Sequence, residues 1–119
     1  MTTQQIANRL IELCRKGEWQ TVHNELFAKD AVSIEQFDSP GFDKETRGID
    51  AIRKKGEQWE QMVTEVHSLK VSDPLIAGNS FTVLMDMEMT MKQDGRRKMT
   101  ELCLYETKDD KIISERFFM

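Results

Sequence analysis

Residues 79–91 read Asn-Ser-Phe-Thr-Val-Leu-Met-Asp-Met-Glu-Met-Thr-Met, and they give the clearest structural signal in the chain. Apolar side chains recur at every second position from Phe81 to Met91, which is the period of a β-strand with one apolar face. A Gln-Asp-Gly turn at 93–95 follows, and residues 99–107 alternate as a returning strand. This pattern predicts an antiparallel hairpin with one apolar face.

A third strand and a covering layer are predicted around this hairpin. Asp109-Asp110 marks a second turn, and residues 112–119 form the last strand. Three strands with one apolar face are not stable alone in water. We therefore expect the residues before Asn79 to cover that face.

Three helical patterns precede the sheet. Thr2 and Gln5 fit a capping box, and the apolar residues that follow recur at helical spacing up to Gly17. The same spacing predicts a second helix from Trp19 to Phe27 and a third over residues 48–62. These helices are the expected cover of the sheet.

The remaining segments predict two further strands and one irregular loop. A short strand spans 31–35, and a longer one spans 63–71. Residues 36–47 show no sustained periodicity and predict a loop, and whether this loop closes as a lid is left open. The order of elements is typical of an α+β domain with helices on one side of an antiparallel sheet. We expect residues 1–119 to form a single domain.

Composition argues against several classes of protein. The chain has 119 residues and a net charge of −4, with both signs interspersed, so no broad basic face is expected for nucleic acid. The two basic clusters, 53–55 and 96–98, are interpreted as solvated surface. Cys14 and Cys103 lie far apart, outside any metal-binding spacing, and predict buried reduced thiols in a cytoplasmic protein.

No targeting segment, membrane span, metal or cofactor is expected. The N-terminus lacks the basic start and apolar core of a secretory signal, and no run approaches the roughly 20 apolar residues of a membrane helix. The two histidines, His23 and His67, fall on different predicted elements, and no His or Cys pair has a zinc spacing.

Several short motifs, taken in order, resemble a known family. They are Leu10–Leu13, Gly17–Trp19, Leu26–Val32, Gly48–Ile52, Tyr105-Glu106 and Lys111–Ile113. With them the chain resembles the NTF2-like superfamily, and within it the SnoaL-like group related to polyketide cyclases and ketosteroid isomerases. The resemblance implies a cystatin-like cone of three N-terminal helices on a strongly curved antiparallel sheet, with an apolar pocket at one end. It also implies a homodimer through the outer sheet faces.

The resemblance places one member of a catalytic constellation on this chain. The general base of ketosteroid isomerases falls on Glu35, where an apolar pocket would favour proton transfer near neutral pH. The alternative is a solvated glutamate at a strand end. The family's oxyanion tyrosine falls on Leu10 and its neutral acid at about Cys103, and neither residue stabilises a dienolate strongly. Steroid isomerisation by that mechanism is therefore not expected.

Other polar groups are expected to complete a site. The family register turns one face of the last two strands toward the pocket, so that Glu35, Glu101, Tyr105 and Glu115 become the candidate catalytic residues. At least one carboxyl should then be protonated or paired with His67 or Arg116. The predicted lining of the ligand pocket consists of Trp59, His67, Phe81, Met85, Met87, Cys103 and Phe117.

Two alternatives remain open from the sequence. A one-residue change of register in the last hairpin would turn Glu115 outward and bring Ser114 and Arg116 inside. The methionine stripe is typical of a core as well as of an adaptable ligand surface. The protein is thus expected to be either an acid/base catalyst of isomerase, cyclase or dehydratase type, acting on an apolar cyclic or polyketide-like molecule, or a non-catalytic ligand-binding or dimeric interaction module.

Overall fold

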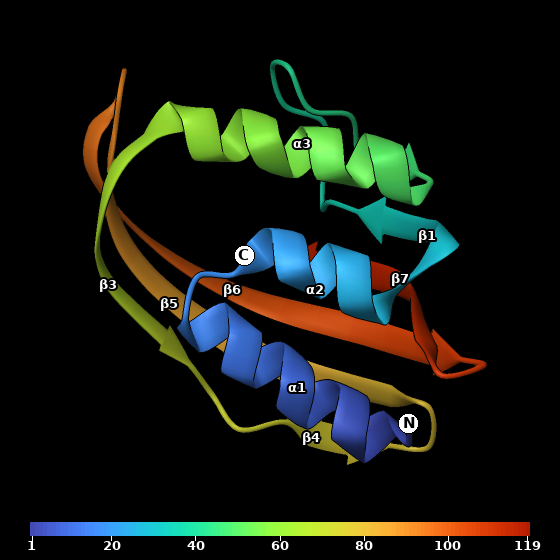
Figure 1. Ribbon diagram of the computed structural model, residues 1–119. Helices are drawn as coiled ribbons and strands as arrows, with labels where there is room; N and C mark the ends of the chain where they lie inside the picture. The colour runs from blue at the N-terminus through green and yellow to red at the C-terminus, as the bar shows by residue number, and fades with distance from the viewer.

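A computed structural model describes all residues, 1–119, and shows three helices and a seven-stranded sheet (Figure 1). The elements are α1 (Thr3–Arg15), α2 (Trp19–Leu26), β1 (Phe27–Ile34), β2 (Glu45–Arg47), α3 (Ile49–Met62), β3 (Val63–Val71), β4 (Leu75–Ala77), β5 (Ser80–Met91), β6 (Gly95–Lys108) and β7 (Lys111–Phe118).

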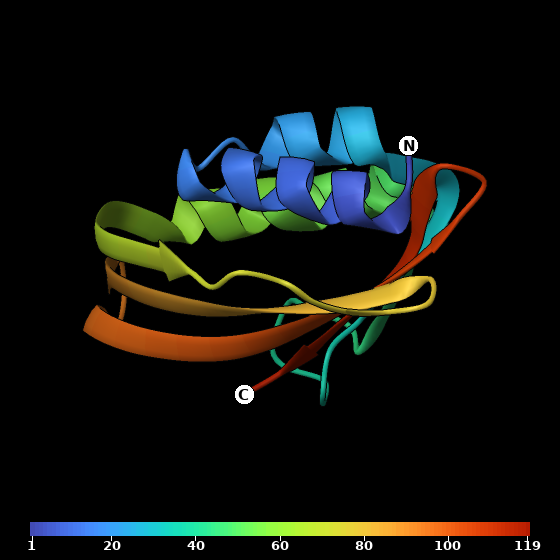
Figure 2. The same ribbon diagram turned by 90° about the horizontal axis from the view of Figure 1, so that it is seen from below.

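The helices form one layer and the curved sheet forms the other, as Figure 2 shows from the side. The strand order is β2-β1-β7-β6-β5-β3, and β4 pairs with β5 outside this path. The predicted α+β class, with three helices on one side of a sheet, is confirmed. The sheet is mixed, because β1 runs parallel to β7 while all other pairs are antiparallel. These two strands lie far apart in sequence, so no hairpin fixes their relative direction.

Local chemistry fixes the beginnings and ends of the first elements. The predicted capping box is present, because the Gln5 amide donates to Thr2 Oγ1 at 3.1 Å and the Thr2 amide donates to Gln5 Oε1 at 2.8 Å. Gly17 ends this part of the chain with a φ of +71°, which glycine adopts without strain. Helix α2 ends one residue earlier than predicted, and β1 begins at Phe27, four residues before the predicted strand.

The last three long strands follow the predicted alternation. In β5, Phe81 and Val83 are each 1% exposed and Met89 is fully buried, so the odd-numbered face packs against the helices. Register places Phe81 beside Tyr105 and Tyr105 beside Glu115. The β6–β7 turn places Asp109 and Asp110 at φ values of 51° and 67°, as a tight hairpin requires.

An irregularity near this turn changes which residues point inward at the start of β7. The register shifts between Glu106 and Thr107, so that Thr107 pairs with Ile112. Ile112 is therefore fully buried in place of Ile113, whereas Glu115 and Phe117 keep the inward direction that the sequence favoured.

Two short strands were not predicted. β2 lies inside the segment interpreted as a loop, and β4 follows Pro74. Each has three residues, too few for alternation to appear in the sequence. None of the three helices is long and apolar enough to cross a membrane.

Candidate functional site

A polar cluster lies between α3 and the inner face of the sheet, and we name it the carboxylate cluster. Its members come from four elements or their ends: Ser33 in β1 and Glu35 just after it, Lys55 in α3, Glu101 in β6 and Glu115 in β7. Ser33 and Glu115 are register partners across the parallel pair, and Glu101 lies opposite Met85. Pairing of distant strands thus brings together residues from both ends of the chain.

Lys55 is the cation of this cluster. Its Nζ donates to Ser33 Oγ at 2.6 Å and to Glu35 Oε1 at 3.2 Å, and it lies 5.6 Å from the centroid of the Phe117 ring. The Lys55 side chain is only 15% exposed. The interpretation of residues 53–55 as a solvated basic cluster is therefore wrong for this lysine.

Sequence reasoning missed Lys55, although the helix pattern contained a signal. Lys55 lies three residues after the buried Ile52 and four before Trp59. Residues at this spacing share one face of a helix, so Lys55 belongs to the inward stripe of α3. Its neighbour Lys54 is exposed. A charged residue on an apolar stripe is the informative exception in such a pattern.

Glu115 is the most deeply buried member of the cluster. Only 5% of the residue is exposed, and it turns inward beside Tyr105. Burial raises its pKa to about 7, an effect that the nearby Lys55 ammonium and the Ser33 hydroxyl oppose and that Glu35 and Glu101 reinforce. The register that would have turned Ser114 and Arg116 inward is excluded by this pairing.

Glu101 has a similar electrostatic environment. Burial raises its pKa to about 7, and the nearby Glu35 adds to the rise. The Cys103 thiol donates to Glu101 Oε1 at 3.5 Å and partly offsets this effect. Two carboxyl groups of the cluster therefore exchange protons close to neutral pH.

Tyr105 and the two thiols remain neutral. Tyr105 is stacked on Phe81 with ring centroids 5.0 Å apart, and burial raises its pKa well above the ordinary value of 10. Burial also raises the pKa of Cys103 far above its ordinary value and that of Cys14 to about 12. Neither cysteine offers the thiolate that nucleophilic chemistry needs.

Comparison with known proteins identifies the family. The SnoaL-like domain family matches this chain over residues 1–119. The chain belongs to this family. No curated protein matches it significantly.

Solved structures share the fold of this SnoaL-like domain. A candidate SnoaL-like polyketide cyclase from Mesorhizobium loti is 33% identical over the whole length of both chains, with a TM-score of 0.89. A protein with a cystatin-like fold from Xanthomonas campestris is 16% identical, with a TM-score of 0.83 over 99% of this chain and 90% of its own. An NTF2-like protein from Burkholderia pseudomallei is 15% identical, with a TM-score of 0.81 over 100% of this chain and 92% of its own.

Neither histidine of this SnoaL-like domain completes the cluster as a charged partner. His67 Nε2 lies 2.6 Å from the Thr90 hydroxyl, and Thr90 alternates with the buried Met89 and Met91, which places His67 on the outer face. Of the alternatives predicted for the buried carboxyls, pairing with His67 is therefore wrong, and so is the placement of His67 in the pocket lining. His23 packs edge-on against Phe27, and burial, reinforced by nearby cations, lowers its pKa to about 4.

Arg116 does not enter the cluster either. It is exposed and pairs in register with Leu104, whereas Glu115 and Phe117 on either side of it turn inward. The cation of the cluster is Lys55, which pairs with Glu35. The structure thus brings Glu35, Glu101 and Glu115 together as predicted and supplies the cation from a different element.

Six of the seven predicted lining residues lie around the same inner face, and His67 is the exception on the outer face. Phe81, Met85 and Cys103 are buried, whereas Trp59, Met87 and Phe117 are half-buried. Phe117 packs against the main core. Half-burial leaves these aromatic and thioether groups partly accessible next to the carboxylates.

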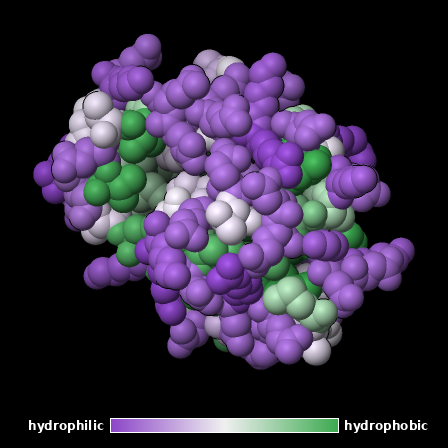
Figure 3. Space-filling view, in the orientation of Figure 1, coloured by the Kyte–Doolittle hydropathy of each residue, from purple (hydrophilic) through white to green (hydrophobic).

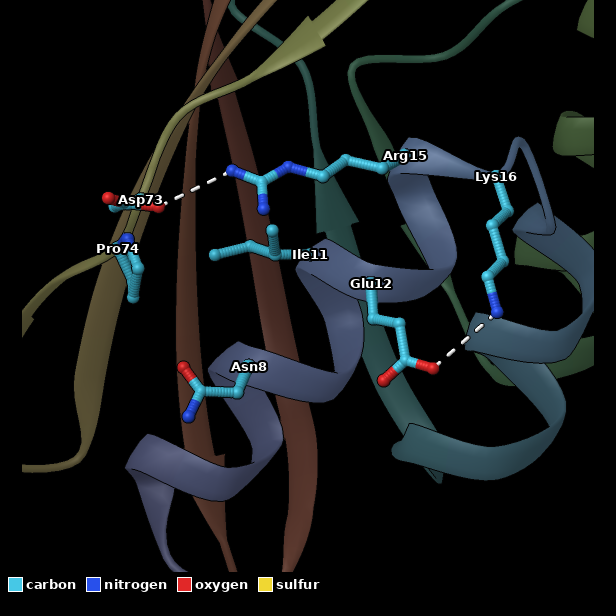
Figure 4. Close-up of a pocket in the computed structure, with 7 residues that line it drawn as sticks. All are labelled: Asn8, Ile11, Glu12, Arg15, Lys16, Asp73 and Pro74. Atoms are coloured by element: carbon cyan, nitrogen blue, oxygen red, sulfur yellow. Dashed lines mark hydrogen bonds and ion pairs between the residues drawn. The ribbon is translucent and has the colours of Figure 1, made fainter.

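Two pronounced hollows lie away from the cluster. A polar groove of about 440 Å³ runs along α1 (Figure 4). In it, Arg15 Nη2 lies 3.3 Å from Asp73 Oδ1, and Lys16 Nζ lies 3.6 Å from Glu12 Oε1. A second hollow of about 260 Å³ lies beside β4 and includes Leu75. The face seen in Figure 3 is mostly hydrophilic, with smaller hydrophobic patches between the hydrophilic side chains. None of the cluster residues lines either hollow.

Proposed function

We propose that this SnoaL-like protein is an acid/base catalyst of isomerase, cyclase or dehydratase type, acting on an apolar cyclic or polyketide-like small molecule. The observation that carries the proposal is the carboxylate cluster, in which Glu35 pairs with the Lys55 ammonium and the inward-facing Glu101 and Glu115 lie close enough to feel the same charge. Three negative charges beside one positive charge in a desolvated space cannot all persist, so the cluster holds protons that it can donate and take back.

The environments of the three carboxyl groups favour different roles. Glu35, paired with Lys55 at 3.2 Å and half-buried, is proposed as the base. Glu101 and Glu115, whose pKa values are raised to about 7, are proposed as the proton-holding acids. Neighbouring carboxyl groups with different environments can divide acid and base duties in this way. Tyr105 is proposed as a neutral hydrogen-bond donor.

The lining of the inner face favours an apolar substrate. Met85 and Met87 bring flexible thioethers next to Glu101, and Trp59 and Phe117 add aromatic surface. Such a surface adapts to ring-containing or chain-like molecules, while a few polar groups fix their orientation. The name of the Mesorhizobium loti relative, a SnoaL-like polyketide cyclase, supports this class of substrate.

Proton exchange tests the proposal without knowledge of the natural reaction. Apolar cyclic ketones that stabilise the folded protein in a thermal-shift screen are incubated with it in deuterated water, and NMR follows deuterium uptake at the carbon next to the carbonyl. Because general base catalysis contributes about 10²–10⁴-fold, Glu35→Gln should slow the exchange by about 100-fold or more.

Glu106→Gln is the matched control for this experiment. Glu106 lies in β6 beside Tyr105 but on the exposed outer face, so its replacement should leave the exchange rate unchanged. Equal loss in both variants, or full activity of a folded Glu35→Gln protein, would show that Glu35 is not the base.

A second proposal concerns the partner of the protein, and the outer sheet face supports it. Leu84, Leu102 and Phe118 are register neighbours across three strands and are 40%, 40% and 38% exposed. We propose that this apolar row joins two copies of the chain in a homodimer, as the family resemblance implies.

The oligomeric state tests this second proposal directly. Leu102→Asp should convert a dimer into a monomer in sedimentation equilibrium, because it places a charge in the centre of the row. Glu106→Gln, farther along the same outer face of β6, should leave the dimer intact. A wild-type protein that is monomeric at micromolar concentration would refute the proposal. A dimer in which no ketone exchanges would favour the alternative, a non-catalytic dimeric module.

A further inference from the structure

We infer that Lys55 is the electrophilic group of the site and that the substrate is an enolisable carbonyl compound, whose oxygen accepts a hydrogen bond from the Lys55 ammonium. The inference rests on the proposed acid/base function and deepens it, because it assigns a further catalytic residue, the donor to the substrate oxygen. It starts from the position of Lys55 Nζ between Ser33 Oγ and Glu35 Oε1.

The donor capacity of the ammonium leaves room for a ligand. A lysine ammonium has three N–H donors, and its bonds within the protein, to Ser33 at 2.6 Å and to Glu35 at 3.2 Å, use two of them. Its side chain retains 15% exposure, so a small molecule beside Phe117 can approach the third donor. Tyr105, proposed as a neutral donor, is only 4% exposed and stacks on Phe81, so the charged donor that a ligand meets is Lys55.

The positions that carry oxyanion donors in related isomerases lack them here. Leu10 is fully buried and apolar, and the Cys103 thiol points to Glu101 Oε1. Enolisation nevertheless needs a group that stabilises the developing negative charge on oxygen. Lys55 is the cation that faces the proposed base, and it satisfies this need from another element.

Burial of Lys55 is also difficult to explain by stability alone. An ion pair moved out of water loses hydration energy that its own attraction often fails to recover, and an apolar residue of similar size is frequently as stabilising. Ile52, which is 1% exposed, and the half-buried Trp59 lie on the same stripe of α3, so this surface accepts apolar side chains. A lysine at this position therefore has a better explanation in chemistry than in packing.

The Glu35 carboxylate takes a proton from the carbon next to the carbonyl, the electrons of that C–H bond form a carbon–carbon double bond, and the carbonyl π electrons move to oxygen. The Lys55 ammonium donates a hydrogen bond to this enolate oxygen. Protonated Glu35 then returns a proton to carbon, the enolate electrons re-form the C–H and C=O bonds, and Glu35 is again a carboxylate. Where Glu101 supplies that proton instead, Glu35 loses its own to water and Glu101 regains one from water. Neither a redox partner nor a cofactor is required.

Two readouts with 2-tetralone, an apolar bicyclic ketone, test the inference. The probe carries ¹³C at its carbonyl, and binding is measured separately by thermal shift. In the wild-type protein the bound carbonyl resonance should move downfield from that of the free ketone, because a charged donor polarises the C=O bond. Lys55→Met should abolish this movement and slow deuterium exchange by about 10²–10³-fold, the effect of losing one oxyanion donor.

Companion variants keep the test decisive. Lys54→Met, which removes the exposed neighbouring ammonium, should change neither readout. Lys55→Gln retains a donor for Ser33 without the charge, and it replaces Lys55→Met if that protein fails to fold. The carbonyl resonance of 2-tetralone bound to Lys55→Gln should also stay close to that of the free ketone.

Each outcome separates the two proposals. A folded Lys55→Met protein with wild-type exchange would overturn the role of Lys55 and leave the acid/base function standing. A carbonyl shift that is lost in Lys55→Met, in a wild-type protein that exchanges no protons, would support the carbonyl site and overturn the acid/base function. Failure of the wild-type protein to bind 2-tetralone would count against the carbonyl substrate class.

Discussion

The inner and outer faces of β5, β6 and β7 differ in the residues that break their pattern. The apolar inner face contains acidic residues, and the polar outer face contains exposed leucines. On the inner face, Glu101 and Glu115 lie among apolar side chains that pack against the helices. On the outer face, Leu84 and Leu102 are exposed among charged and polar pairs, such as Glu88 with Arg96 at 2.8 Å. Each face contains residues that suit the other face, and these exceptions carry both proposals.

The largest expected effect separates the faces by stability. Phe81→Ala removes a side chain that is 1% exposed and should reduce the free energy of unfolding by about 3–5 kcal/mol, because it loses apolar burial and leaves a cavity. Leu84→Ala, three residues later on the outer face and 40% exposed, should cost less than about 1 kcal/mol in the monomer. Urea denaturation of both variants measures the difference.

Protein concentration sharpens this comparison. If the outer face joins two copies, the loss in free energy of unfolding caused by Leu84→Ala should grow as the protein concentration rises. The loss caused by Phe81→Ala should not depend on dimer formation. If the two variants lose the same free energy of unfolding at every protein concentration, the outer leucines are neither a free surface nor an interface.

Much of the fold could be predicted because its strongest signals are local. The alternation from Phe81 to Met91, the capping box at Thr2 and the turn at Asp109-Asp110 each depend on residues close in sequence. The parallel pairing of β1 with β7 depends on contacts between distant segments, and no local pattern specifies its direction. The three-residue strands β2 and β4 were not predicted for a different reason, because they are too short to show a period.

The site was predicted in part for the same physical reasons. Glu101 and Glu115 follow from strand alternation, which holds wherever no bulge intervenes. His67 was placed on the wrong face because it is the extra residue at a register shift of β3 between Val66 and Ser68, where alternation fails. Leu69 and Val71, beyond the shift, keep the inward direction that alternation predicts. Lys55 was missed because two adjacent basic residues suggested solvent, although its spacing from Ile52 indicated the core.

A smaller expected effect distinguishes the faces by their response to pH. Burial raises the pKa of Glu115 from its ordinary value of 4.5 to about 7, so the folded protein binds more protons than the unfolded chain between these values. The stabilising contribution of protonated Glu115 is therefore present below about pH 4.5 and is lost as pH rises through about 7. Glu115→Gln removes this loss, and the variant should be more stable than wild type by roughly 2–3 kcal/mol above pH 7, with little difference at pH 4.5.

His23 makes the comparison between variants necessary. Its pKa is lowered to about 4, so its contribution has the opposite sign: it favours the folded state above the ordinary value of 6.5 and is lost as pH falls through about 4. In the wild-type protein the two effects partly cancel, and the raw pH profile of stability can appear flat. The difference between Glu115→Gln and wild type isolates the carboxyl, with Glu106→Gln as the control from the exposed face. If the difference in free energy of unfolding between Glu115→Gln and wild type does not change with pH, Glu115 is ionised when buried. Glu101 would then have to be the carboxyl group that holds the proton of the carboxylate cluster.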